Sequence, residues 1–250
     1  MFEKNIRFLA SPKYLEWADK STYPIPAVKN IPSWFKKLNN DVDDITVKHC
    51  KPFLDSMSSG YILKMAYDFR IRHNIDNPDT GKKDGYQDTG IRKTSPIALK
   101  HQINFPWNNQ FHPSGQLEGS PLVKKNKDLA FHKIINPWII RTPPGYSCLF
   151  VPPLNNEDDR FTILPGIVDT DKFELEINFP FVVNGDKYEQ LVTTIKVGTP
   201  YVQVLPFKRD SWKMKIETIS KEQQEKDRVN FYTKVMHYYR DLAWTKKSYK

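Results

Sequence analysis

Short runs of apolar residues dominate the second half of the chain. Between residues 134 and 216, six runs rich in Ile, Val, Phe, Tyr and Thr follow one another, and Gly or Pro bounds nearly all of them. Spacing and boundaries of this kind are typical of an antiparallel sandwich or barrel. The six runs are 134–142, 145–154, 160–169, 173–183, 191–198 and 200–209.

Two features sharpen this prediction. Residues 173–179 alternate apolar side chains with Glu and Asn, so Phe173 and Leu175 are expected to point inward from a strand. Asn184-Gly185 follows, and because both residues accept positive φ, the pair predicts a hairpin turn. Residues 45–72 also contain alternating stretches, and the first of these, 45–50, predicts a half-buried strand.

The N-terminal residues 1–44 follow no such pattern. Four prolines interrupt them, and each fixes φ and removes a backbone donor. Aromatic residues lie between the prolines, so we expect an arm that is pinned by its rings on its own domain or on a neighbouring one. The main anchors are Trp17, Tyr23, Trp34 and Phe35.

The C-terminal residues 217–250 predict one α-helix and a basic tail. Ser220 is the expected N-cap of a helix over 219–244, and Gln223 completes a capping box. Apolar residues recur at intervals of three and four along a wide aromatic face. Aromatic residues commonly anchor interfaces, so this face predicts a partner contact, although its rings could instead pack on the chain's own sheet. The predicted partner-binding residues are Phe231, Tyr232, Tyr238 and Tyr239.

Composition narrows the class of protein. Of 250 residues, 39% are hydrophobic and 13% aromatic, which excludes long disorder. No apolar run reaches the length of a membrane span, and the first residues do not resemble a signal peptide, so we expect a soluble, cytosolic protein without membrane contact. Two cysteines, Cys50 and Cys148, form no disulfide framework and are expected to be buried thiols in β-like runs.

The net charge of +9 is concentrated at the C-terminal end. From Phe207 onward there are 12 Lys or Arg against 6 Asp or Glu, which gives 12 − 6 = +6 of the +9. A basic tail can contact nucleic acid, but a solvated helix face is favoured because no Arg/Gly repeat or long basic block accompanies it.

The sequence predicts neither a metal nor a cofactor. His101, His112 and His132 lack the spacing of a metal site. The chain also carries no P-loop, no Rossmann glycines, no Gly-x-Ser-x-Gly elbow and no His-Glu-x-x-His.

Three stretches resemble the trimeric dUTPase and dCTP-deaminase superfamily, whose fold is a β-clip. They are 166–177, 197–203 and 144–147. The resemblance implies a β-clip-like barrel or sandwich in which Asp169 positions water, Phe173 stacks on deoxyribose and Gln203 lines the pocket, with His112 beside them. Ser147-Cys148-Leu149-Phe150 stands where that superfamily has its phosphate-binding Arg-Ser-Ser, and this replacement removes donors that hold a triphosphate.

A broader resemblance covers nearly the whole chain. Its most specific motifs are Thr142-Pro-Pro-Gly-Tyr-Ser147 and Gly166-Ile-Val-Asp-Thr-Asp171, and Pro206-Phe-Lys-Arg209 accompanies them. These motifs are similar to a family of uncharacterised proteins from tailed phages of marine cyanobacteria. The resemblance implies a place in the host cytoplasm during infection or in the virion.

Together these features predict a mainly β protein with a Pro-rich arm (1–44), a β-rich domain (45–216) and a C-terminal helix with a basic tail (217–250). The favoured function is a non-catalytic structural or interaction protein of a tailed phage, whose partners are other phage proteins or further copies of itself. The alternative is a diverged nucleotide or small-metabolite hydrolase or isomerase on a dUTPase-like fold.

Overall fold

Antiparallel strands in two main sheets form the body of the protein. The computed structural model describes residues 4–39, 46–76, 83–84, 111–112, 114–122, 131–233 and 238–250. The larger sheet has the strand order β12-β10-β15-β3-β2. Its strands are β2 (Ile25–Pro26), β3 (Tyr61–Lys64), β10 (Tyr146–Val151), β12 (Gly166–Val168) and β15 (Pro200–Lys208).

The second sheet has the order β11-β13-β8-β7. Its strands are β7 (Phe111–His112), β8 (Phe131–Ile134), β11 (Phe161–Ile163) and β13 (Phe179–Val183). Three strand pairs complete the described β structure: β1 (Arg7–Leu9) with β9 (Ile139–Arg141), β4 (Phe69–His73) with β14 (Leu191–Ile195), and β5 (Ile75–Asp76) with β6 (Lys83–Asp84). The prediction of a mainly β, antiparallel fold is confirmed. Its form among these residues is a sandwich rather than a closed barrel.

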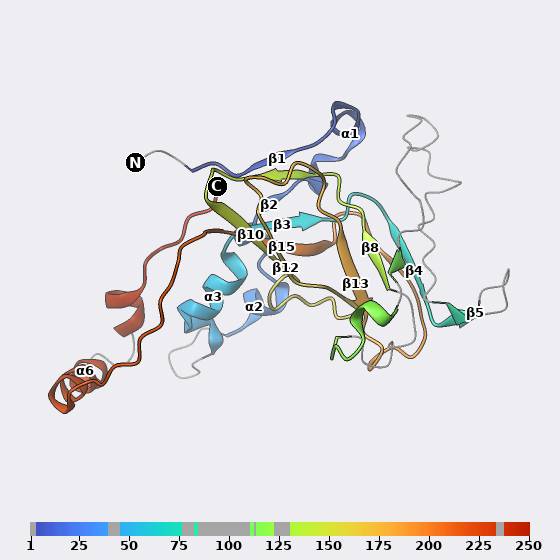
Figure 1. Cartoon of the computed structure of the whole chain (residues 1–250). Coiled ribbons are helices and arrows are strands. Elements are labelled where there is room, and N and C mark those ends of the chain that lie inside the picture. The colour runs from blue at the N-terminus through green and yellow to red at the C-terminus, as the bar shows by residue number, and fades with distance from the viewer. Residues whose placement is uncertain are drawn as a thin grey trace.

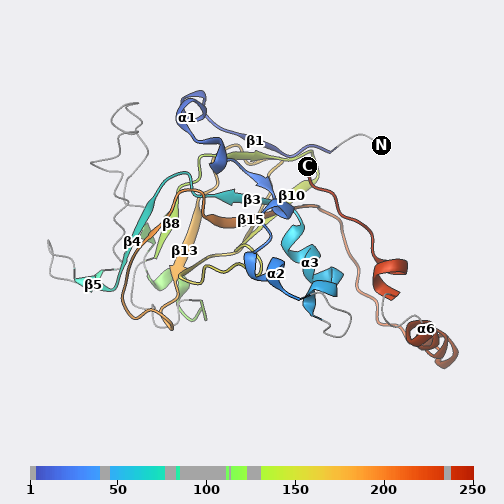
Figure 2. The same ribbon diagram turned by 180° about the vertical axis from the view of Figure 1, so that it is seen from behind.

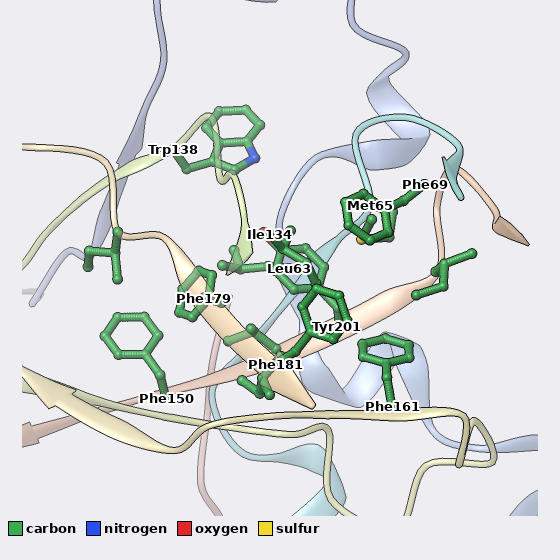
Figure 3. Packing of buried hydrophobic residues seen from close by; sticks show 14 of the residues in the cluster. Leu63, Met65, Phe69, Ile134, Trp138, Phe150, Phe161, Phe179, Phe181 and Tyr201 are labelled. Atoms are coloured by element: carbon green, nitrogen blue, oxygen red, sulfur yellow. The ribbon is translucent and has the colours of Figure 1, made fainter. Parts of the chain in front are cut away.

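The core lies between the two main sheets. Phe150 and Tyr201 from the larger sheet both contact Phe179 from the smaller one, with ring centroids 5.3 and 5.7 Å apart (Figure 3). Leu63 and Ile163, one from each sheet, are fully buried in the same cluster. Aromatic rings bury large apolar areas, so this seam contributes much of the stability of the body.

The N-terminal part of the chain contains three short helices beside the strands: α1 (Pro12–Trp17), α2 (Ser33–Lys37) and α3 (Lys51–Ser58). Helix α1 begins at Pro12 because Ser11 caps it: the Ser11 hydroxyl accepts a bond from the Tyr14 amide at 3.2 Å. In α2, the Trp34 indole N–H donates to the Asn155 carbonyl at 2.9 Å.

The strand predicted over 45–50 is wrong in the residues that the structure describes. Val47–His49 form a 3-10 turn, and Cys50 is an exposed residue at the N-cap of α3. Pro52 lies in the first turn of α3, where a missing N–H costs no hydrogen bond. The helix that begins after Cys50 therefore forms in place of the strand that the short alternation predicted. Cys50 is exposed and is not the buried thiol that was predicted.

The alternation over 173–179 also fails to give the predicted strand. Leu175 is 63% exposed and Phe173 is exposed too, so the buried apolar residues of this stretch are Ile177 and Phe179. The Phe173 amide donates to the Asp169 carbonyl at 2.9 Å, which turns the chain immediately after β12. The segment then crosses from one sheet to the other. None of the described strands pairs with it on the way.

The Asn184-Gly185 turn does not close a hairpin. The chain does turn here, with the Lys187 amide donating to the Asn184 carbonyl at 3.1 Å. However, β13 pairs with β11 and β8, whereas β14 pairs with β4. Neither Asn184 nor Gly185 adopts a positive φ. The turn therefore connects strands of different sheets.

The C-terminal end leaves the body of the molecule. Helix α6 (Lys221–Thr233) has the predicted cap, because the Ser220 hydroxyl accepts a bond from the Gln223 amide at 3.2 Å. A π-helical turn, Tyr239–Ala243, follows. Residues 234–237 lie outside the described residues, so a continuous helix over 219–244 is tested only in part. Both views place α6 away from the sheets (Figures 1 and 2). None of the described helices combines the length and the apolar character needed to cross a membrane.

Candidate functional site

Three of the sequence motifs meet at one end of the larger sheet. Strand β10 carries Ser147, β12 runs into the turn with Asp169 and Asp171, and Arg209 directly follows β15. Because β10 lies between β12 and β15, these residues become neighbours although they are far apart in sequence. We call Ser147, Asp169, Asp171 and Arg209 the Arg209 cluster.

Arg209 and Asp171 form a two-pronged ion pair. Arg209 Nη1 is 2.8 Å from Asp171 Oδ1, and Nη2 is 2.5 Å from Oδ2. The Gly145 amide also donates to Asp171 Oδ2 at 2.8 Å, from a glycine with φ of +83°. The Arg209 guanidinium and this amide favour the ionised carboxylate, so the pKa of Asp171 lies well below its usual range.

Ser147 and Asp169 complete the cluster. The Ser147 hydroxyl donates to Asp169 Oδ1 at 2.6 Å and accepts from Arg209 Nη1 at 2.9 Å. Asp169 also lies 3.2 Å from Arg209 Nη1, and its side chain is 54% exposed. Ser147 itself is fully buried, so its hydroxyl is inaccessible to a substrate. Two carboxylates against one guanidinium leave a net charge of 1 − 2 = −1 on these groups, which disfavours a phosphate ligand.

Hydroxyl groups next to the Arg209 cluster form a second, buried set of contacts. Thr170 is fully buried, and its hydroxyl lies 2.7 Å from the hydroxyl of Thr142 and 3.4 Å from the Cys148 sulfur. Burial raises the pKa of the Cys148 thiol to about 11, so the thiol stays protonated at neutral pH. Cys148 is thus the buried, unreactive thiol that the sequence predicts.

The four residues of the nucleotide-site hypothesis are not gathered around one pocket. Asp169 and Phe173 share a turn, but Gln203 is fully buried and its amide is fully engaged. Gln203 Oε1 accepts from the Leu154 amide at 3.0 Å, and Nε2 donates to the carbonyls of Ser56 and Ser59 at 2.8 and 2.7 Å. These three bonds fasten β15 to α3 and to the loop after β10.

His112 belongs to the other sheet, in β7. Its Nδ1 lies 2.9 Å from Gln116 Oε1, and its ring stacks on Phe131 with centroids 5.0 Å apart. In the part of the chain that the structure describes, no group of three His, Cys, Asp or Glu side chains is arranged to hold a metal ion. His101 and the side chain of His132 lie outside the described residues.

A second feature lies directly after the Arg209 cluster, in residues 210–219. We call this extended segment the C-terminal arm. Trp212 is 91% exposed, and Met214 and Ile216 are almost as exposed. The backbone of 211–219 makes no hydrogen bond with itself or with another described residue. The first backbone bond after it joins Gln224 to Ser220, at the start of α6. Sequence reasoning missed this segment, although its alternation Trp-Lys-Met-Lys-Ile is the signal of a half-buried strand.

The last residues of the chain return to the body. The Trp244 indole N–H donates to Asp55 Oδ2 at 2.8 Å, and Lys247 Nζ lies 2.7 Å from the same oxygen. Tyr249 then packs edge-on against Tyr61 of β3, with ring centroids 5.9 Å apart. Part of the basic tail is therefore engaged with a carboxylate of its own chain.

The predicted partner-binding tyrosines lie between the arm and this anchor. Tyr239 is exposed and Tyr238 is half-buried at the π-helical turn. Phe231 and Tyr232 belong to α6, and their side chains lie outside the described part of the structure.

Comparison with protein-family models finds no model that matches the chain, and comparison with curated proteins finds no relative.

Proposed function

We propose that this protein is a non-catalytic structural or interaction protein of a tailed phage, which joins its partners through the C-terminal arm and the helix that follows it. The observation that carries the proposal is the row of exposed large apolar residues in the arm, Trp212, Met214 and Ile216. Exposed apolar groups of this size commonly mark an interaction site. The motifs gathered in the Arg209 cluster support the phage context, because they are the ones that resemble the phage family.

The chemistry of the Arg209 cluster supports a structural role for it. Its hydroxyl is buried, and its guanidinium contacts two carboxylates, the Ser147 hydroxyl and the Tyr146 carbonyl, the last at 3.1 Å. A general acid or base must reach its substrate and change its protonation state near the working pH. Asp171 is held ionised and Ser147 is covered, so the cluster instead fixes the point at which the arm leaves β15.

The proposal is tested by asking where the protein is found during infection. Particles are purified to constant density, and the protein is quantified by mass spectrometry relative to a known particle component. We expect it in particles or in assembly intermediates at a fixed ratio. Its absence from both, together with steady hydrolysis of dUTP or dCTP that Asp169→Ala abolishes, would contradict the proposal. Lys221→Ala in the exposed start of α6 is the matched control for the hydrolysis assay.

A further inference from the structure

The C-terminal arm has a counterpart elsewhere on the same chain. Residues 172–177, which we call the receiving segment, leave β12 after the turn and carry exposed Phe173 and Leu175. Their backbone from Glu174 to Ile177 makes no hydrogen bond to another described residue. Arm and receiving segment are thus two stretches outside the described strands with open backbone groups and exposed apolar side chains, and the receiving segment bends at Leu175.

The two segments are complementary in pattern and in charge. In an extended chain successive side chains point to opposite faces. The arm therefore presents Trp212, Met214 and Ile216 on one face and Lys213 and Lys215 on the other. In the receiving segment two glutamates alternate with the exposed apolar residues, and straightening at Leu175 would place them on opposite faces. Paired side by side, the segments would place apolar next to apolar and Lys next to Glu, which are the favourable cross-strand neighbours. The exposed apolar residues of the receiving segment are Phe173 and Leu175, and its glutamates are Glu174 and Glu176.

One copy of the chain does not bring the two segments together. Both start at the Arg209 cluster, but Glu174 lies 3.1 Å from Arg141 of β9, which holds the receiving segment along β9. The arm runs from β15 toward α6, on the other side of the molecule, as both views show (Figures 1 and 2). The anchor of Trp244 on Asp55 of α3 keeps the far end of the arm on that side.

We infer that the C-terminal arm of one copy pairs as a β-strand with the receiving segment of a second copy. This inference rests on the proposed function and names its first partner as the chain itself. Strand addition supplies affinity through main-chain bonds and specificity through alternate side chains.

Charge reversal tests the pairing in the full chain. Lys213→Glu with Lys215→Glu changes the arm, and Glu174→Lys with Glu176→Lys changes the receiving segment. We expect the native chain to self-associate in sedimentation velocity and each reversed variant to bind at least about tenfold more weakly, because opposed charges become like charges. An equimolar mixture of the two variants regains association. Lys20→Glu with Lys29→Glu changes two exposed lysines of the N-terminal segment, is the matched control and leaves association unchanged.

Disulfide trapping distinguishes pairing between copies from pairing within one copy. In a Cys50→Ser background, Met214→Cys is placed on one tagged chain and Leu175→Cys on another. We expect an oxidised product that contains both tags. A monomeric native chain, or a crosslink that forms only when both cysteines are on one chain, overturns the inference. A monomeric protein that is nevertheless present in phage particles overturns the pairing alone, whereas absence from particles and from assembly intermediates, together with hydrolysis of dUTP or dCTP, overturns the proposed function.

Discussion

The two ends of the chain have similar apolar content and opposite environments. Tyr14 near the N-terminus is 5% exposed and packs edge-on against Trp17 and Trp138, with ring centroids 4.9 and 5.4 Å away. Trp212 near the other end touches none of the core residues and is almost wholly exposed. In the first segment, β1 and β2 pair with strands of the body. The second segment has no such pairing in the described residues.

This difference shows what anchors an irregular segment. Prolines remove donors and prevent regular pairing, so the N-terminal segment depends on rings that fit into the core and on a few backbone bonds. One of these bonds joins the Ala27 amide to the Gly60 carbonyl at 2.9 Å. The C-terminal arm has the alternation of a strand, and in the part of the chain that the structure describes it is attached where it begins, at Arg209, and beyond α6, at Trp244. In the proposed pairing, a second copy of the chain covers its apolar face.

Removing the aromatic anchor of the N-terminal segment should have the largest effect. We expect Tyr14→Ala to lower the free energy of unfolding by about 3 kcal/mol, because it leaves a cavity among packed rings. Trp212→Ala, the same kind of truncation in the arm, should change it by less than about 0.5 kcal/mol at concentrations where the chain is a monomer. Urea denaturation measures both. Equal losses would show that the two ends are anchored alike.

Gly60 should rank next. Its φ is +75°, and a Cβ there would lie 2.0 Å from the Val204 carbonyl oxygen. We expect Gly60→Ala to cost at least about 2 kcal/mol, through backbone strain and the shift of β15 away from the N-terminal segment. Gly115→Ala is the control, because no atom lies within 4 Å of a Cβ built there and its φ is not positive. Unfolding of the two variants at the same urea concentration would contradict the predicted strain at Gly60.

The Asp171–Arg209 pair at the origin of the arm should give a pH signature. The folded-state pKa of Asp171 is depressed by the Arg209 bond, so its contribution to stability is present above the unfolded value of about 3.9 and is lost as pH falls toward the folded value. We expect Asp171→Asn to be less stable than the native chain at pH 7, with the difference shrinking below about pH 4. Thermal unfolding at several pH values measures it. A difference that stays constant down to pH 2 would contradict this assignment.

The smallest effect is expected at the far anchor. Asp55→Asn weakens the contacts to Trp244 and Lys247, so the free energy of unfolding should fall by no more than about 1 kcal/mol. Hydrogen exchange of peptides from 239–250 should nevertheless accelerate, because the tail leaves α3. Asp210→Asn, which removes another exposed ion pair with Lys208, is the control and should leave this exchange unchanged.

Local patterns in the sequence predicted a large part of the fold. All six runs between 134 and 216 contain strands, and the Ser220 cap begins a helix as expected. These features depend on period-two alternation, on Gly and Pro boundaries and on capping chemistry, which act over a few residues. Where two local signals competed, as at Cys50, the alternation gave the wrong answer. The same alternation occurs at 173–177 and 212–216, and neither segment forms a strand in the described structure.

The sequence by itself determined the mainly β class, the irregular N-terminal segment and the buried thiol of Cys148, because composition and spacing control burial and backbone preference locally. Only the tertiary structure decided that the Gln203 side-chain amide makes three hydrogen bonds to backbone groups far away in sequence. It alone also brought Ser147, Asp171 and Arg209 together at one end of the sheet. The reason is physical: strand order and register join residues that are tens of positions apart, and no local pattern encodes which strand becomes the neighbour of which.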